Sequence, residues 1–109
     1  MLNLRLYMLQ RITALVMVPF VVIHIAVMIY AVQGGLSATE ILGRTQGSIW
    51  WIVFYGTFVI AVSIHATISL RVIVSEMTRL EGKILDVTSW IALALLMVLG
   101  LRAVFAVTI

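Results

Sequence analysis

Residues 63–76 read SIHATISLRVIVSE, a stretch in which a histidine, His65, lies inside a long apolar run that ends at an arginine, Arg71. Followed back toward the N-terminus, the run extends to about residue 49 with no acidic, lysine or arginine side chain. At about 1.5 Å per residue, some 20 apolar residues cross the roughly 30 Å hydrocarbon core of a bilayer. The stretch therefore predicts a transmembrane helix over residues 49–71 with a histidine inside the membrane.

Two further apolar runs of similar length lie on either side of it, at residues 12–32 and 87–107. The composition agrees, because 64% of the 109 residues are hydrophobic and 10% are charged, whereas soluble domains are about 45–50% apolar and about 25% charged. We predict an all-α membrane protein with three transmembrane helices, forming a single membrane-anchor domain over residues 1–109. Membrane lipid is then its immediate environment.

Local signals predict how these helices bend, begin and end. Pro19 lies inside the first run and predicts a kink, because proline removes a backbone donor from the helix. The glycine pair at residues 34–35 is expected to end that helix. Ser37 or Thr39 is suited to cap a short helical turn after it, and Thr88 or Ser89 to cap the start of the third span.

Cysteine is absent, which excludes disulfides and any iron–sulfur or thiolate metal site built from this chain alone. The formal net charge is +3, but the basic residues are scattered, so nucleic-acid binding has no support. In a membrane protein these residues report topology. Arg44 and Arg102 lie on one side of the three spans, and five basic residues lie on the other: Arg5, Arg11, Arg71, Arg79 and Lys83. The excess predicts that the N-terminus lies inside and the C-terminus outside.

The start of the chain also bears on its location. Two arginines precede the first run, which continues for about 20 residues without a small-residue cleavage pattern, so we interpret it as a retained span rather than a signal peptide. We find no transit segment, which favours a bacterial or archaeal plasma membrane over a mitochondrial inner membrane. In either membrane the protein is expected to be multi-pass.

The two histidines are the candidate functional residues. Inside a bilayer a neutral histidine still needs hydrogen-bond partners, and it either bonds to a neighbouring helix or has a functional role. Counted along the helices, His65 lies about 9 Å from Arg71, whereas His24 lies about 20 Å from Arg11, deeper in the membrane. They are therefore not expected to share one metal atom. Each is suited to supply one axial ligand to a haem whose second ligand comes from a partner chain.

The pattern around His65 resembles the cytochrome b membrane-anchor subunits of succinate:quinone oxidoreductases, the succinate dehydrogenases and fumarate reductases. In that family a haem-ligating histidine is followed by an arginine and then by an acid, and His65, Arg71 and Glu76 stand at the matching places. The start of the first span, LQRITAL, is similar to the family's His-Arg-x-Ser/Thr-Gly segment, with Arg11 and Thr13 matching.

The same segment departs from the family pattern at three positions. Gln10 replaces a common histidine, Ala14 replaces a common glycine, and Tyr7 stands where some members have a serine near the quinone. These departures bear on the details of quinone contact. The three spans still fit the family over the whole chain.

The resemblance implies a non-catalytic electron-transfer subunit of an oxidoreductase complex, with no catalytic residues of its own. It would anchor a flavoprotein subunit and an iron–sulfur subunit on the inner face and pass electrons between the latter and quinone. It would also hold b-type haem, one or two per complex, with a second membrane-anchor subunit. Such an assignment would place the protein in the tricarboxylic acid cycle.

The resemblance also suggests residue roles. His65 matches the haem-iron ligand, and His24, which follows a proline, is similar to the first-helix histidine of two-haem members. Arg11 and Tyr7 are candidates for quinone contact. Three arginines have two possible roles each: Arg11, Arg71 and, at the outer side, Arg102. Each either pairs with a quinone or a haem propionate or serves only as an interfacial anchor.

Two other classes of function remain open at this point. A small multi-spanning transporter fits the length, but such proteins usually need an acidic group inside the membrane. Here every acid falls in a connection or at a span boundary: Glu40, Glu76, Glu81 and Asp86. A cofactor-free structural adaptor is the third reading, and the two intramembrane histidines argue against it.

Overall fold

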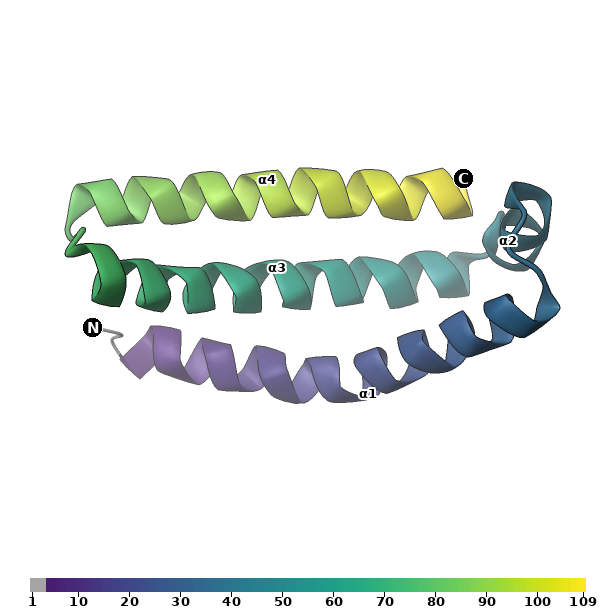
Figure 1. Ribbon diagram of the computed structural model, residues 1–109, viewed down its shortest axis with the longest axis horizontal. Coiled ribbons are helices and arrows are strands. Elements are labelled where there is room, and N and C mark those ends of the chain that lie inside the picture. The colour runs from purple at the N-terminus through teal and green to yellow at the C-terminus, as the bar shows by residue number, and fades with distance from the viewer. Residues whose placement is uncertain (1–3) are drawn as a thin grey trace.

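The computed structural model describes residues 4–109, which form four helices (Figure 1). These are α1 (Leu4–Gly34), α2 (Ala38–Thr45), α3 (Ile49–Thr78) and α4 (Lys83–Thr108). Residues 1–3, which the predicted domain includes, lie outside the described residues.

Three of these helices, α1, α3 and α4, are long and apolar enough to cross a membrane. The predicted all-α class and its three spans are therefore confirmed. Each helix is longer than the predicted span: α1 begins at Leu4 rather than near residue 12, and α3 continues to Thr78. Hydropathy marks only the apolar middle of a helix, whereas the backbone hydrogen bonds continue into its polar ends.

The long helices lie side by side, with α3 between α1 and α4 (Figure 1). The start of α1 and the connection between α3 and α4 lie at one end, here called the N-terminal end. Helix α2 and the C-terminus lie at the other, here called the α2 end (Figure 1). Three spans place the two described chain ends on opposite sides of the bundle, and which of them faces inward stays a prediction.

The turn signals in the first half of the chain are borne out. Helix α1 bends partway along its length (Figure 1), and Pro19 lies inside it. It ends at Gly34, and Gly35 adopts a φ of 126°, which a residue with a side chain rarely adopts. Ser37 then caps α2, because its hydroxyl accepts from the Glu40 N–H at 3.2 Å and the Glu40 carboxylate accepts from the Ser37 N–H at 3.4 Å.

The expected cap of the third span is wrong. Helix α4 begins at Lys83 after Gly82, whereas a cap at Thr88 or Ser89 would require the helix to begin later. Both hydroxyls instead donate to backbone carbonyls one turn earlier in the helix, at 2.7 and 2.8 Å. A hydroxyl satisfied in this way does not mark a helix start. Asp86 occupies the first turn, where a negative charge is favourable.

Few side chains of the described residues are buried. The buried apolar ones are Ala61, Ile68, Leu85 and Val104. Large apolar side chains instead cover the outside, such as Leu15 at 73% and Trp50 at 81% exposure. A surface of this kind is suited to lipid or to another membrane protein rather than to water.

Helix α4 packs tightly against α3 at a glycine. A Cβ added to Gly100 would lie 2.5 Å from Cγ1 of Val59 on α3. Valine is stiff in a helix because its β-branch restricts χ1, so it cannot turn away easily. Small residues at such contacts let membrane helices approach closely.

We therefore expect Gly100→Ala to destabilise the protein by about 1–3 kcal/mol through overpacking against Val59. Gly56→Ala is the matched control, because a Cβ at Gly56 meets nothing within 4 Å and alanine is the better helix former. The free energy of unfolding in mixed micelles measures both. Equal stability of the two variants would contradict the proposed contact.

Candidate functional site

His65 lies on α3 toward the N-terminal end, and its imidazole turns toward α1. Its Nδ1 atom is 3.1 Å from the backbone carbonyl oxygen of Gln10 and 3.3 Å from Oγ1 of Thr13. The side chain is half-buried, and Thr13 is buried with 6% of its surface exposed. The histidine therefore joins the two helices through one ring nitrogen.

The same contact is extended by two more polar side chains. The Gln10 side-chain amide donates to Oγ of Ser69 at 3.0 Å, and Ser69 donates to the backbone carbonyl of His65 at 2.9 Å. Thr13 Oγ1 lies 2.9 Å from the carbonyl oxygens of both Leu9 and Gln10. Sequence reasoning treated Gln10 only as a departure from a family pattern, and here it forms part of the α1–α3 contact.

The second ring nitrogen of His65, Nε2, makes no hydrogen bond to any of residues 4–109. A histidine with Nδ1 bonded to the protein and Nε2 free has the usual arrangement of a metal or haem ligand. The donor set therefore fits one axial ligand of a haem iron. Within the described residues, no three His, Cys, Asp or Glu side chains gather to hold a metal ion.

Arg11 and Tyr7 lie together on the exposed side of α1, one turn apart. Arg11 donates to the Tyr7 hydroxyl at 3.1 Å, and its guanidinium lies 5.7 Å from the centre of the Tyr7 ring. Both are close in sequence to Gln10, so they lie at the same end of the bundle as the His65 contact. The structure thus brings the two candidate quinone residues together.

Arg71 makes an ion pair that the sequence analysis did not predict. Its Nη1 lies 2.6 Å from Oδ1 of Asp86, which links α3 to α4 at the N-terminal end. The signal was present, because an arginine ends one span and an acid begins the next across a short connection. Arg71 also lines a cavity of about 730 Å³ with several polar residues, among them Glu76, Arg79 and Glu81.

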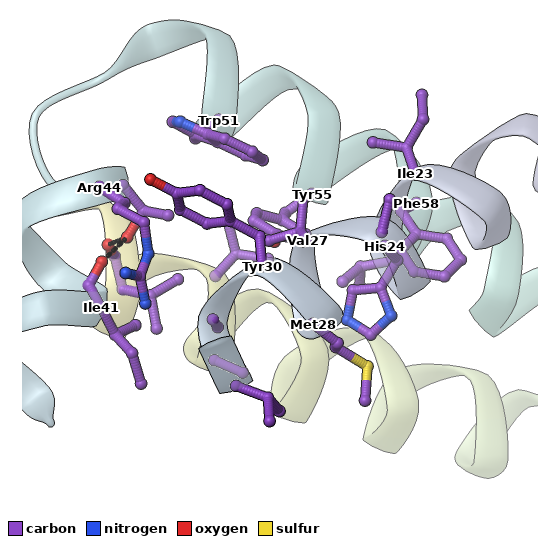
Figure 2. Close-up of a pocket in the computed structure, with 18 of the residues that line it drawn as sticks. Ile23, His24, Val27, Met28, Tyr30, Ile41, Arg44, Trp51, Tyr55 and Phe58 are labelled. Carbon is purple, nitrogen blue, oxygen red and sulfur yellow. Dashed lines mark hydrogen bonds between the residues drawn. The ribbon is translucent and has the colours of Figure 1, made fainter. Parts of the chain in front are cut away.

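His24 lies elsewhere, on the wall of a cavity of about 1020 Å³ at the α2 end. Its ring lies 5.5 Å from that of Phe58 and 6.1 Å, edge-on, from that of Tyr55, both on α3. Figure 2 shows His24 toward one side of this cavity and Arg44 toward the other, with Tyr30 between them. The walls are otherwise mainly apolar and aromatic.

Among the residues that line this cavity, Arg44 is the one arginine or lysine. The sequence analysis gave Arg44 only a role in topology. Its Nη2 donates to the Gly35 carbonyl at 2.9 Å, and its guanidinium lies 5.4 Å from the centre of the Tyr30 ring. Its position in the last turn of the short helix α2, which follows the first span, was the signal in the sequence that could have indicated this role. Arg102, the residue predicted for a haem propionate here, is exposed and is not among the lining residues.

Helix α2 is held against the end of α4, which closes this part of the bundle. Thr45 donates to the Val107 carbonyl at 2.5 Å, and the Gly47 N–H donates to the Thr108 carbonyl at 2.7 Å. These bonds satisfy carbonyls at the C-terminal end of a helix, which have no partner within it. The segment that carries Arg44 is thus fixed to α1 on one side and to α4 on the other.

The two histidines lie at different depths along the bundle. His24 is level with Tyr55 and Phe58, whereas His65 follows them on the same helix by seven to ten residues. At about 1.5 Å per residue this separates the two sites by about 11–15 Å. They are two separate sites.

Comparison with known proteins supplies the family. The family described as the succinate dehydrogenase/fumarate reductase transmembrane subunit matches residues 2–108, almost the whole chain. The resemblance seen in the sequence is therefore confirmed. No curated protein and no solved structure matches the chain.

The ion pair of Arg71 with Asp86 is expected to contribute a small coupling energy, about 0.2–1 kcal/mol, because Asp86 is half-exposed and water screens the pair. A double-mutant cycle with Arg71→Gln and Asp86→Asn, read by the free energy of unfolding, measures it. Glu81→Gln is the control for loss of an exposed acid at the same end. A coupling of zero, with additive single effects, would show that the pair does not stabilise the α3–α4 junction.

Proposed function

Because the chain belongs to the succinate dehydrogenase/fumarate reductase transmembrane subunit family, we propose that it is the membrane anchor of such a complex and binds b-type haem. The anchor function agrees with three membrane-spanning helices. Family membership favours it over the transporter considered above. The complex would lie in a bacterial or archaeal plasma membrane and serve the tricarboxylic acid cycle.

The observation that carries the haem proposal is the geometry of His65. Its Nδ1 is held by α1 and its Nε2 is free of protein partners among residues 4–109. A histidine that only joined two helices would gain nothing from leaving Nε2 without a partner inside the membrane. When bound, the haem would supply one-electron chemistry at the iron, and the protein supplies the ligand, its orientation and a low dielectric.

The proposal requires partner subunits. One histidine at each depth leaves the second axial ligand to a second membrane-anchor subunit, whose helices would cover apolar surface that is exposed here. At the N-terminal end, exposed charges such as Glu76, Arg79 and Glu81 offer a docking surface for the iron–sulfur subunit. That subunit would in turn carry the flavoprotein subunit.

We propose the cavity at the α2 end as the place of a second haem, with His24 as its ligand. The cavity is large and mainly apolar, and it has a guanidinium within it. Arg44 is suited to pair with a propionate there. Arg102 lies on an exposed face of α4, so its contact with a propionate would need a haem shared with the partner subunit.

Quinone is proposed to bind near the N-terminal end, beside Arg11 and Tyr7. Arg11 retains donors beyond the one bonded to Tyr7, and both side chains are exposed. Arg71 is a further candidate for contact with quinone or a propionate, in competition with its ion pair to Asp86. Electrons would pass here between the iron–sulfur subunit and quinone.

The haem proposal predicts a b-type band in the reduced-minus-oxidised spectrum of the purified complex. We expect His65→Ala to lose the haem of the N-terminal end, and His24→Ala to lose one haem of two while the other remains. The reason is that each histidine is the chain's one ligand at its depth. Haem per flavin, from the pyridine haemochrome and flavin absorbance, measures both outcomes.

Tyr55→Phe is the control, because it removes only a hydroxyl from the wall of the same cavity and keeps both His24 and the aromatic ring beside it. A complete and active complex without haem would refute both ligand assignments. An unchanged haem-to-flavin ratio in His24→Ala would refute the second site alone.

For quinone, we expect Arg11→Gln to lower kcat/KM for quinone reduction about tenfold or more, because a hydrogen bond to a charged group contributes about 1.5–3 kcal/mol. Succinate oxidation with an artificial acceptor that bypasses the membrane subunit should not change. Arg5→Gln removes an exposed charge from the same end of α1 and serves as the control. Equal quinone kinetics in the two variants would exclude Arg11 from the site.

A further inference from the structure

We propose that Thr13 and the backbone carbonyl of Gln10 on α1 are positioning groups for His65, which fix Nδ1 as its N–H nitrogen and reserve Nε2 for the iron. The inference rests on the proposed function, since it assumes that His65 binds haem. Helix α1 supplies no iron ligand at this depth, but its acceptor groups decide which nitrogen of His65 is available to the iron.

The first step follows from the chemistry of the carbonyl. The Gln10 backbone oxygen can only accept a hydrogen bond, and it lies 3.1 Å from Nδ1 of His65. Nδ1 must therefore carry the proton. In a neutral imidazole the other nitrogen, Nε2, is then unprotonated and presents its lone pair.

The second step concerns the Thr13 hydroxyl, which has a single proton. Two carbonyl oxygens, of Leu9 and Gln10, lie 2.9 Å from Oγ1, closer than the His65 ring at 3.3 Å. Both carbonyls are acceptors, so either one takes that proton and Oγ1 turns a lone pair toward Nδ1. Thr13 thus acts as a second acceptor for the same N–H and favours the same tautomer.

The third step is that this arrangement is fixed in place. Thr13 is the one buried residue of α1 in the described chain, so water does not compete for its hydroxyl. The Gln10 amide bonded to Ser69, and Ser69 bonded to the His65 carbonyl, hold the two backbones at this level. The imidazole therefore meets a preformed pair of acceptors.

An acceptor on the N–H of a ligating histidine raises the basicity of the ligand nitrogen. A more basic ligand stabilises the oxidised, more positively charged iron. Loss of the Thr13 oxygen should therefore raise the midpoint potential of this haem and weaken its binding. Thr13 acts on the iron only through His65, and it is a positioning residue rather than a ligand.

The test compares Thr13→Val, which keeps the shape and removes the oxygen, with Thr13→Ser, which keeps the hydroxyl, in the assembled complex. Redox titration gives the midpoint potential of the haem that depends on His65. The fraction of this haem that the complex retains in an excess of apo-myoglobin gives its affinity. We expect Thr13→Val to raise the midpoint potential and to weaken haem binding about tenfold. Thr13→Ser should match the parent on both readings.

Thr88→Val is the matched control, because the Thr88 hydroxyl also donates to a carbonyl within its helix but lies on α4, away from His65. Should the valine variant fail to assemble, Thr13→Ala removes the oxygen without added bulk. A midpoint potential and haem affinity equal to those of Thr88→Val would overturn the role of Thr13 while leaving the haem site intact. Absence of any haem that depends on His65 in the parent complex would overturn the proposed function as well.

Discussion

The hydrogen bonds between the His65 ring and α1 are the interactions on which this structure most depends. Lipid gives no hydrophobic reason for one apolar helix to pack on another, so polar contacts and close packing must hold the helices together. Helix α1 buries little else, since Thr13 is its one buried residue within residues 4–109. Ring contacts of Phe20 and His24 with α3 also join these two helices. The polar contact at His65 both joins α1 to α3 and orients the candidate ligand, so stability and function share these atoms.

The other helix pair is held differently. Helix α4 approaches α3 closely where Gly100 faces Val59, and the ion pair of Arg71 with Asp86 joins their ends. At the opposite end, α2 bonds to the last carbonyls of α4 and carries Arg44 into the cavity. One side of α3 is thus closely packed, whereas the wall facing α1 at the α2 end is left open enough for a large apolar ligand.

Much of the fold followed from the sequence because its signals are local. Hydropathy located the three spans, Pro19 lies inside the bent α1, and Ser37, one of the two expected caps, caps α2. The family was recognisable because His65, Arg71 and Glu76 keep their order on one helix. Each of these signals can be seen without knowing how the helices rotate against one another.

What could not be foreseen depends on that rotation. The acceptors of His65, the partner of Arg71 and the approach of Arg44 to the cavity of His24 all join residues far apart in the chain. The start of α4 was placed too late because a hydroxyl can bond within its own helix as readily as it can cap one. For the candidate sites, the sequence indicated the histidines, and the structure added the groups that surround them.

The bonds from α2 to the end of α4 also have a consequence for the order of assembly. A chain is synthesised from its N-terminus, so α1, α2 and α3 are available before α4. The acceptors of Thr45 and Gly47 are the Val107 and Thr108 carbonyls, which are made only with α4. Until α4 is in place, the cavity lacks the wall that includes Gly100, Ala103, Val104 and Val107. Any cofactor held there would gain its full enclosure only after insertion of the third span, so its loading would be a late event in biogenesis.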